Sequence, residues 1–365
     1  MEKKIVAWCL FLLYPAVFFA PILQPVLDFN YWHVFLFSIL NVIGFSYFIS
    51  IKETSGILNN IIKSNISIVS ILFFVWAICS YFYSILPTEV LVKLLLFVNF
   101  YVLFINLHTT LKFLNIKLIH ISLIITLLLV AELIYSYLPY FWVIEYRPYT
   151  FEENARLIGL FANRNVTSAI YLIQLPFVIY LVKETRSVLL KNFGFLVLFA
   201  NLFMIFLLAS RTAYVAMFFL FVLFLAIYLI NKPEIRYFFK TFFGLYITFF
   251  LISFLFINIT IGFNNSANPI ERIQTIDVQE TSTNSRIRYY KYALEHFKSN
   301  PFIGVGYGNW KIVSIDKDRE NIESYIVPYT MHNDFLEVLV ELGIIGFVLY
   351  ILIFVFSLNY LKNVI

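Results

Sequence analysis

The sequence has 365 residues, of which 61% are hydrophobic and 13% are charged. A soluble domain usually carries about 25% charged residues, so a chain of this composition cannot cover itself with polar surface. Its 43 Phe and 25 Tyr are typical of a lipid-facing exterior with aromatic belts. The composition predicts an all-α, polytopic membrane protein. The net charge of +5 is modest and is spread over loops, which argues against nucleic-acid binding.

Runs of about 20 apolar residues, the length that crosses a bilayer as a helix, recur along the chain. The first run resembles a signal peptide without a clean cleavage site, so we expect it to remain as a span. Cys9 and Cys79 lie within such runs and are expected to be small buried hydrophobic residues. The ten predicted spans are 5–23, 31–51, 66–86, 90–107, 117–138, 166–182, 190–209, 212–230, 241–261 and 334–359.

The distribution of Lys and Arg over the short loops predicts the orientation of the spans. Alternate short loops carry basic residues, such as Lys52 and Lys63, whereas loops 24–30 and 87–89 carry none. By the positive-inside rule both termini are cytoplasmic. The long segments 139–165 and 262–333 then lie outside, because long loops cross regardless of charge. In a bacterium this places a multi-pass protein in the inner membrane with these segments in the periplasm.

Ionisable residues within the predicted spans gather near the outer ends. Lys93, Glu132, Glu337 and Glu341 all follow this pattern. A transporter usually places such groups near the midplane, so the pattern favours binding or chemistry at the outer interface. The alternative, that charges near helix ends only extend to the headgroups, accounts poorly for Glu341, which lies two turns into its helix.

Two polar motifs flank spans in the second half of the chain. "LLASRTAY" places Arg211 in a tight outer hairpin, where a guanidinium can bind phosphate bidentately or extend to lipid headgroups. In "GLFANRNVTSA" we expect Asn165 to be the N-cap of the next span. The polar groups left there to line a site are Arg156, Asn163 and Arg164.

The long outer loop contains "NSRIRYYKYALEHFKSNPFIGVGYGNW". Its spacing predicts an amphipathic helix that Asn284 or Ser285 caps and that ends before Pro301. Arg286 and Arg288 at the start of this helix would suit a diphosphate. The "GVGYG" that follows does not have the dinucleotide spacing, and we expect it to form a tight turn.

The last predicted span begins with "HNDFLEVLVELG". His332 titrates near neutral pH and can remove a proton from a sugar hydroxyl. Asn333 or Asp334 can cap the helix, and Glu337 with Glu341 can orient the histidine or bind hydroxyls. A divalent metal held by His332, Asp334 and Glu337 is an alternative, although the spacing matches no firm template. A purely structural polar cap is a further alternative that leaves Glu341 unexplained.

Taken in order, "GLFANRN", "SR", the long-loop motif and "HNDFLEVLVELGIIGF" resemble the bacterial O-antigen ligase family, which also includes polysaccharide polymerases and protein O-oligosaccharyltransferases. The resemblance covers residues 156–350. It implies N-terminal transmembrane helices at 1–155 and a ligase-like region at 156–365, including the periplasmic loop 262–333. Family members commonly have more spans than this sequence, which ends after the helix following His332. The sequence is either naturally short or truncated, and a truncated chain would lack helices that support the site.

The resemblance implies transfer of a glycan from undecaprenyl diphosphate to an acceptor hydroxyl, with no cofactor or metal. Arg211 and Arg286 would bind the diphosphate and stabilise its departing charge, and His332 would be the base. The acceptor is lipid A-core for a ligase or a second lipid-linked glycan for a polymerase, and a flippase is the alternative outside the family. The candidate substrate-binding residues are Arg156, Asn163, Arg164, Arg288, Asn333 and Glu337.

Overall fold

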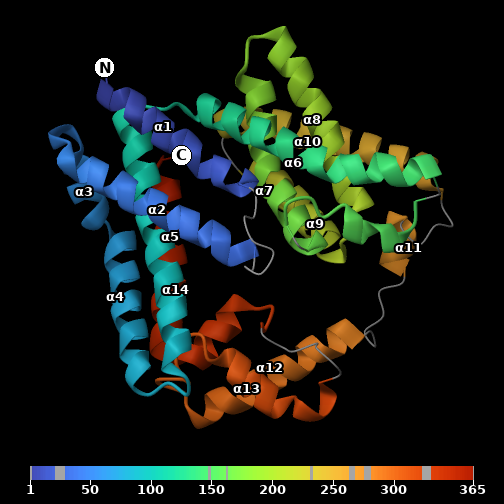
Figure 1. Cartoon of the computed structure of the whole chain (residues 1–365). Coiled ribbons are helices and arrows are strands. Elements are labelled where there is room, and N and C mark those ends of the chain that lie inside the picture. Colours follow the sequence, from blue (N-terminus) through green and yellow to red (C-terminus); the bar gives the residue numbers. More distant parts are fainter. Residues whose placement is uncertain are drawn as a thin grey trace. The chain divides into compact units, whose positions relative to one another are not determined.

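The computed structural model describes residues 2–20, 29–146, 149–161, 163–230, 233–262, 268–274, 281–322 and 330–364. Every regular element in these ranges is a helix, as predicted (Figure 1). Packing divides the chain into two compact units, Met1–Asn115 with Asp277–Ile365 and Ile116–Ile276, and each is described by itself. The predicted boundary between residues 155 and 156 followed sequence motifs rather than packing, and it stays a prediction.

Eight helices within the described ranges are long and apolar enough to cross a membrane, so the chain is a multi-pass membrane protein. Each overlaps one of the predicted spans, although α6 (Leu118–Tyr146) continues into the predicted outer segment 139–165. These stretches are Trp32–Ser50 in α2 (Phe29–Ser50), Asn65–Phe82 in α4 (Asn65–Cys79) and the following 3-10 turn, α5 (Pro87–Leu114), α6 (Leu118–Tyr146), α7 (Arg164–Glu184), α8 (Val188–Leu207), Lys240–Ile261 in α10 (Pro233–Ile261), and Asp334–Tyr360 in α14 (Asp334–Val364).

The other two predicted spans also correspond to helices. Helix α1 (Glu2–Ala16) is followed by a 3-10 turn at Val17–Phe19, and the predicted end at residue 23 lies outside the described residues. Helix α9 (Arg211–Ile230) covers the predicted span 212–230. The two cysteines, on α1 and α4, are exposed rather than buried. That expectation was wrong because an apolar side chain on a membrane helix can face lipid as readily as the protein core.

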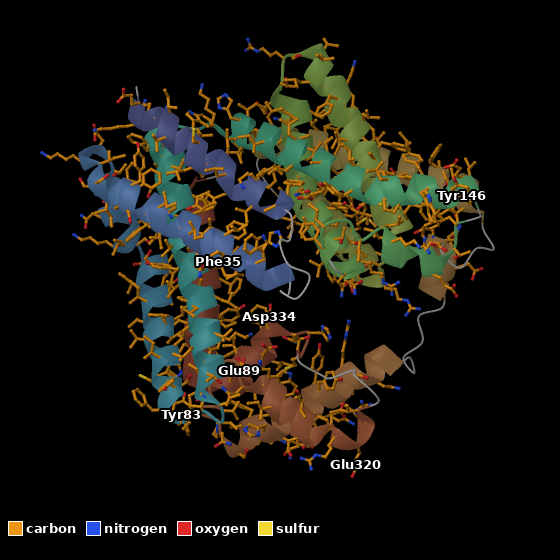
Figure 2. All side chains as sticks on the ribbon, in the orientation of Figure 1. Phe35, Tyr83, Glu89, Tyr146, Glu320 and Asp334 are labelled. Atoms are coloured by element: carbon orange, nitrogen blue, oxygen red, sulfur yellow. The ribbon has the colours of Figure 1, made fainter. Side chains whose placement is uncertain are left out.

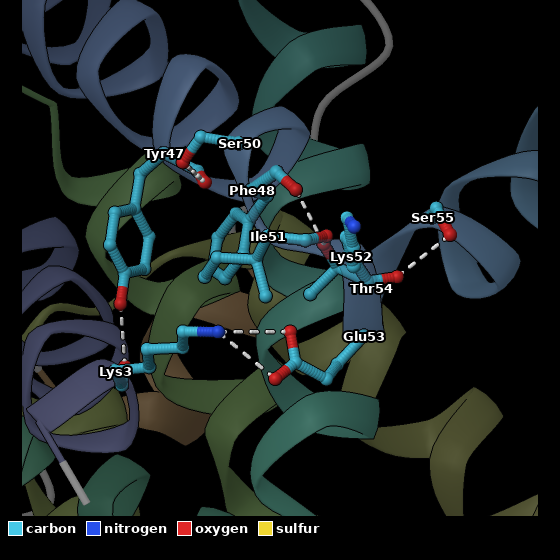
Figure 3. A network of polar contacts seen from close by, with 9 residues as sticks. All are labelled: Lys3, Tyr47, Phe48, Ser50, Ile51, Lys52, Glu53, Thr54 and Ser55. Atoms are coloured by element: carbon cyan, nitrogen blue, oxygen red, sulfur yellow. Dashed lines mark hydrogen bonds and ion pairs between the residues drawn. The ribbon is translucent and has the colours of Figure 1, made fainter.

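Helix α3 (Lys52–Ile62) was not predicted. It packs one face against α5 and leaves its polar face exposed, as a helix lying in a membrane interface does. Its first turn is fixed by the contacts drawn in Figure 3. Lys3 Nζ lies 3.0 Å from Glu53 Oε1, and the Thr54 hydroxyl donates to the Ile51 carbonyl at 2.7 Å. These contacts connect α3 to the N-terminal helix.

In the first unit, α14 packs along α4, and α5 packs along α2 (Figure 1). Two loop helices, α12 (Thr281–Ser299) and α13 (Trp310–Lys317), pack near the start of α14. Helix α12 is the predicted amphipathic helix and ends before Pro301 as expected. It begins at Thr281, however, so Asn284 and Ser285 lie inside it and are not its caps. The buried core here is Ala293, Val305, Trp310, Val313, Met331 and Val340.

The second unit contains α6 to α10 and a short helix, α11 (Pro269–Gln274). A buried polar network joins α6, α7 and α8. The Gln174 amide donates to both carboxylate oxygens of Glu132, at 3.3 and 3.1 Å, and the Tyr171 hydroxyl donates to the Glu132 carbonyl at 3.2 Å. Asn201 donates to the Tyr171 carbonyl at 3.0 Å. Such polar contacts hold helices together in lipid, and they give the embedded Glu132 a structural partner.

Candidate active site

The predicted site residues fall into two groups, one in each compact unit. The group in the first unit surrounds the start of α14 and the loop helices. The group in the second unit surrounds the starts of α7 and α9. The first group is Arg286, Arg288, His332, Asn333 and Glu337, and the second is Arg156, Asn163, Arg164 and Arg211.

His332 lies directly before α14 in a left-handed backbone conformation, with φ of +58°. A non-glycine residue adopts this region rarely, so the surrounding contacts must hold it there. Asn333 contributes, because its Oδ1 accepts the Leu336 N–H at 3.2 Å and so caps α14. Of the two caps left open by the sequence, Asn333 takes that role, and Asp334 is the first helical residue. His332 is accessible to solvent, although part of its surface is covered.

Glu337 holds the segment that carries His332. Its Oε2 accepts the Met331 N–H at 3.3 Å, and its Oε1 lies 3.2 Å from Lys93 Nζ. Lys93 also lies over the ring of Tyr307, 5.9 Å from its centroid. Because the Glu337 side chain is only 13% exposed, this ion pair is screened less than a surface pair. Glu337 thus connects α14 to α5 and to the backbone next to His332.

Arg286, on α12, is the cation that acts on His332. Partial burial lowers the pKa of His332, and the positive charge of Arg286 lowers it further, whereas Glu337 opposes the shift. The imidazole is therefore neutral at pH 7 and has a lone pair with which to accept a proton. Within the part of the chain that the structure describes, Arg286 makes no ion pair with a carboxylate. Its guanidinium can therefore receive an anionic group.

Arg288 has a different environment from Arg286. Its Nε and one terminal nitrogen donate to the two carboxylate oxygens of Asp318, at 2.9 and 3.2 Å. The Asp318 side chain is 2% exposed and also accepts the Asn321 amide at 3.1 Å. This bidentate pair raises the pKa of Arg288 and joins α12 to the end of α13. Since α12 begins at Thr281, neither arginine stands at its N-terminus, contrary to the sequence-based expectation.

A break in α14 receives the glycine-rich turn of the loop. Gly343 has φ of +64° and ψ of −169°, which interrupts the helical hydrogen bonds. The Val305 N–H donates to the Val340 carbonyl at 3.1 Å, and the Gly306 N–H donates to the Glu341 carbonyl at 2.9 Å. These bonds satisfy carbonyls that the break would otherwise leave unpaired. Gly304, Gly306 and Gly308 all have positive φ, so the predicted tight turn is present.

The other side of this turn packs on the end of the α4–α5 hairpin, where Figure 2 labels Tyr83 and Glu89. The Tyr83 hydroxyl donates to the Ile303 carbonyl at 2.8 Å. Lys311 Nζ lies 2.5 Å from Glu89 Oε2. The turn is thus held between α14 and the hairpin, within one unit.

Glu341, which the sequence left unexplained, caps α13. Its side chain is 1% exposed, and its Oε1 accepts the backbone N–H of Trp310 at 2.9 Å. Trp310 is the first residue of α13, so the carboxylate also lies at the positive end of that helix. This acidic residue therefore has a structural role that connects the loop to a membrane helix.

In the second unit, the starts of α7 and α9 adjoin. Asn163 caps α7, since its Oδ1 accepts the Asn165 N–H at 2.8 Å, and Arg164 is the first helical residue. The expected cap, Asn165, instead accepts the Ser210 hydroxyl through Oδ1 at 2.7 Å. Ser210 in turn accepts the Ala213 N–H at 3.3 Å and caps α9. One hydrogen bond therefore joins the first turns of two helices.

Arg211 is the first residue of α9, at the junction of these helix starts. With Arg164 at the start of α7, two arginines and two positive helix ends occupy adjacent positions. Helix N-termini and guanidinium groups both bind phosphate oxygens well. Arg156 differs, because it pairs with Glu153 at 2.9 Å and lies over the Trp142 ring, 5.4 Å from its centroid.

The metal alternative finds no support in the geometry near His332. Among the described residues, no group of three or more His, Cys, Asp or Glu side chains is placed to hold a metal ion. Glu337 is turned toward Lys93 and the Met331 backbone, and Asp334 is exposed. The three proposed ligands thus form no such group.

Comparison with known proteins finds one similarity, over residues 195–351. The family model of the O-antigen ligase matches residues 195–351, which include Arg211, Arg286 and His332. No curated protein and no solved structure matches the chain. The match agrees with the motifs found in the sequence and with the all-helical, multi-pass fold. Residues 195–351 are therefore similar to the O-antigen ligase family.

Proposed function

We propose that the protein transfers a glycan from undecaprenyl diphosphate to an acceptor hydroxyl at the periplasmic face of the inner membrane. The similarity of residues 195–351 to the O-antigen ligase family supports activity of the O-antigen ligase or polymerase type. The acceptor that we propose is the lipid A-core, which makes the protein an O-antigen ligase. Membrane lipids surround its spans, and the donor supplies its own activated bond, so no nucleotide sugar is needed.

The observation that carries the proposal is the junction of α7 and α9. Arg164 and Arg211 begin two helices whose first turns are connected through Asn165 and Ser210. A diphosphate carries several negative charges, and this junction supplies two cations and two helix dipoles. Fixed positive groups also stabilise the charge that develops on the leaving diphosphate. Asn163 and Arg156, near the start of α7, are proposed to contact the sugar part of the donor.

The proposed chemistry uses His332 as a general base. The neutral imidazole accepts the proton of the acceptor hydroxyl as that oxygen forms a bond to the anomeric carbon of the donor. The bond between the anomeric carbon and the phosphate oxygen breaks, and undecaprenyl diphosphate leaves with the electron pair. Arg286 is proposed to contact the diphosphate during this step. Asn333, Glu337 and Arg288 are proposed to bind or position the sugars.

Gene disruption tests the proposal through the composition of the surface glycan. A ligase is expected to leave lipid A-core without polymer while lipid-linked polymer accumulates. If the disrupted strain instead carries single repeats on its lipid A-core, the protein is a polymerase. Lipid-linked repeats held on the cytoplasmic side would overturn transfer altogether and favour a flippase. Gel separation and mass analysis of the glycans distinguish these results.

Complementation of the disrupted strain tests the site. His332→Ala and Arg211→Ala are expected to restore normal membrane levels of the protein without restoring transfer. Lys52→Gln, an exposed change on α3, is the matched control and is expected to restore wild-type glycan. Normal transfer by both site variants would overturn the proposed mechanism, while leaving the similarity to the O-antigen ligase family intact.

A further inference from the structure

A partly polar pocket lies at the opposite end of α14 from His332, within the first unit. It has a volume of about 410 Å³ and is lined by α3, the start of α4, the last turns of α5 and Tyr360 of α14. None of the residues assigned to glycan transfer lines it. The pocket therefore needs an explanation of its own.

The ends of three candidate spans place this pocket at a membrane surface. Helix α4 begins at Asn65, α5 ends at Leu114, and the apolar stretch of α14 ends at Tyr360. The amphipathic α3 lies next to these helix ends and packs against α5. In the predicted topology, this is the cytoplasmic surface. A tyrosine ring at the edge of a span is typical of the headgroup region.

Among the described residues, the polar part of the pocket contains one cation, Lys112, and no carboxylate. His108 lies one turn before Lys112 near the end of α5, also lines the pocket, and can donate an imidazole N–H. Over the described ranges, neither side chain forms an ion pair. The first turn of α4 adds its helix dipole, with Ser64 as the cap that accepts the Ser67 N–H at 3.3 Å. These groups together favour an anion.

The remainder of the lining is apolar, and this property decides which anion fits. Ile57, Ile61, Ile66 and Phe104 form that part of the wall. An inorganic phosphate would leave these side chains in contact with water. A phospholipid places its phosphate beside Lys112 and His108 and its glycerol and first acyl carbons against the apolar wall, which removes apolar surface from water.

We propose that this pocket binds the headgroup of an anionic phospholipid from the membrane leaflet. Lys112 and His108 of α5 hold its phosphate beside the first turn of α4. The binding is independent of the glycan-transfer site. A lipid held there connects α3, α4, α5 and α14, so it stabilises the unit when it binds.

The test uses the purified, delipidated full chain in a neutral detergent and measures its melting temperature. Short-chain phosphatidylglycerol is expected to raise the melting temperature at concentrations where phosphatidylcholine and inorganic phosphate do not. Lys112→Gln is expected to raise the phosphatidylglycerol concentration that produces a given rise in melting temperature by roughly tenfold or more. A change of this size corresponds to the loss of one charge-assisted hydrogen bond. Lys112→Arg keeps the charge and is expected to retain the response.

The control is Lys52→Gln, which removes an exposed lysine of α3 that does not line the pocket. It is expected to respond like the wild type. An equal response of Lys112→Gln and wild type overturns the proposal, as does an equal effect of phosphatidylcholine. If inorganic phosphate alone reproduces the effect, the site binds a free anion, and the assignment to lipid is wrong.

Discussion

The carboxylate of Glu341 accepts the backbone N–H of Trp310 at 2.9 Å, so a residue inside α14 caps the helix that follows the glycine turn. The same stretch of α14 is broken at Gly343 and receives the turn through backbone hydrogen bonds. The loop is thereby fixed to the membrane helix that begins beside His332. The geometry around His332 therefore depends on residues that need not contact a substrate.

Removing the Glu341 carboxylate tests this connection. In Glu341→Ala, the buried N–H of Trp310 loses its acceptor, which costs about 1–3 kcal/mol. We expect a lower melting temperature and faster tryptic cleavage after Lys311 and Lys317. Glu341→Gln keeps a carbonyl acceptor and should lose less. If alanine and glutamine variants both melt like the wild type, the cap does not stabilise the loop.

A methyl group at Gly343 is expected to disrupt the docking of the turn. The Cβ of Gly343→Ala would overlap the Phe302 carbonyl oxygen, and its backbone conformation, with φ of +64° and ψ of −169°, adds roughly 1–3 kcal/mol of strain for a residue other than glycine. The matched control is Gly56→Ala in α3, where a Cβ meets no atom within 4 Å and alanine favours the helix. Gly343→Ala should melt at a lower temperature, and Gly56→Ala at the same or a higher one. The reverse order would contradict the packing described here.

Replacing Arg288 is expected to lower the melting temperature, whereas replacing Arg286 is expected to lower the rate of glycan transfer. Arg288→Gln leaves the buried Asp318 without its cation, and a hydrogen bond to a charged group contributes about 1.5–3 kcal/mol. That variant should therefore melt at a lower temperature. Arg286→Gln breaks no ion pair within the described residues, so it should keep the melting temperature and transfer glycan at a reduced but measurable rate. Equal melting of the two variants would remove this distinction.

Local patterns in the sequence predicted the parts of the structure that depend on local interactions. Apolar runs located the eight candidate spans, and Pro301 marked the end of α12. Helix α3 was missed because its eleven residues are too few to span a membrane, although its amphipathic spacing carried a signal.

Contacts between distant residues were not predictable from local patterns. Asn163 and Asn165 have equal propensity to cap a helix, and only the bond from Ser210, 45 residues away, separates their roles. The pairing of Arg288 with Asp318 likewise joins residues 30 apart. Glu341 remained unexplained for the same reason, because its partner Trp310 precedes it by 31 residues.

The pH dependence of transfer tests His332 as the base. Only the neutral imidazole can accept a proton, so activity should fall as pH drops through the pKa of His332. Partial burial and Arg286 both lower this pKa. The midpoint of the acid limb in the curve of transfer rate against pH should therefore lie below the ordinary histidine value of about 6.5. Removing the positive charge in Arg286→Gln raises the pKa and should move the limb to higher pH. Removing the negative charge in Glu337→Gln lowers the pKa and should move the limb to lower pH.

The measurement is the rate of transfer against pH with purified protein and lipid-linked donor, scaled to each variant's own maximum. Scaling separates the position of the limb from the loss of rate that either change causes. Lys317→Gln on α13 changes an exposed charge and serves as the control, with an unmoved limb expected. Shifts of Arg286→Gln and Glu337→Gln in the same direction would contradict the assignment, because a base near both groups must respond to their charges with opposite signs.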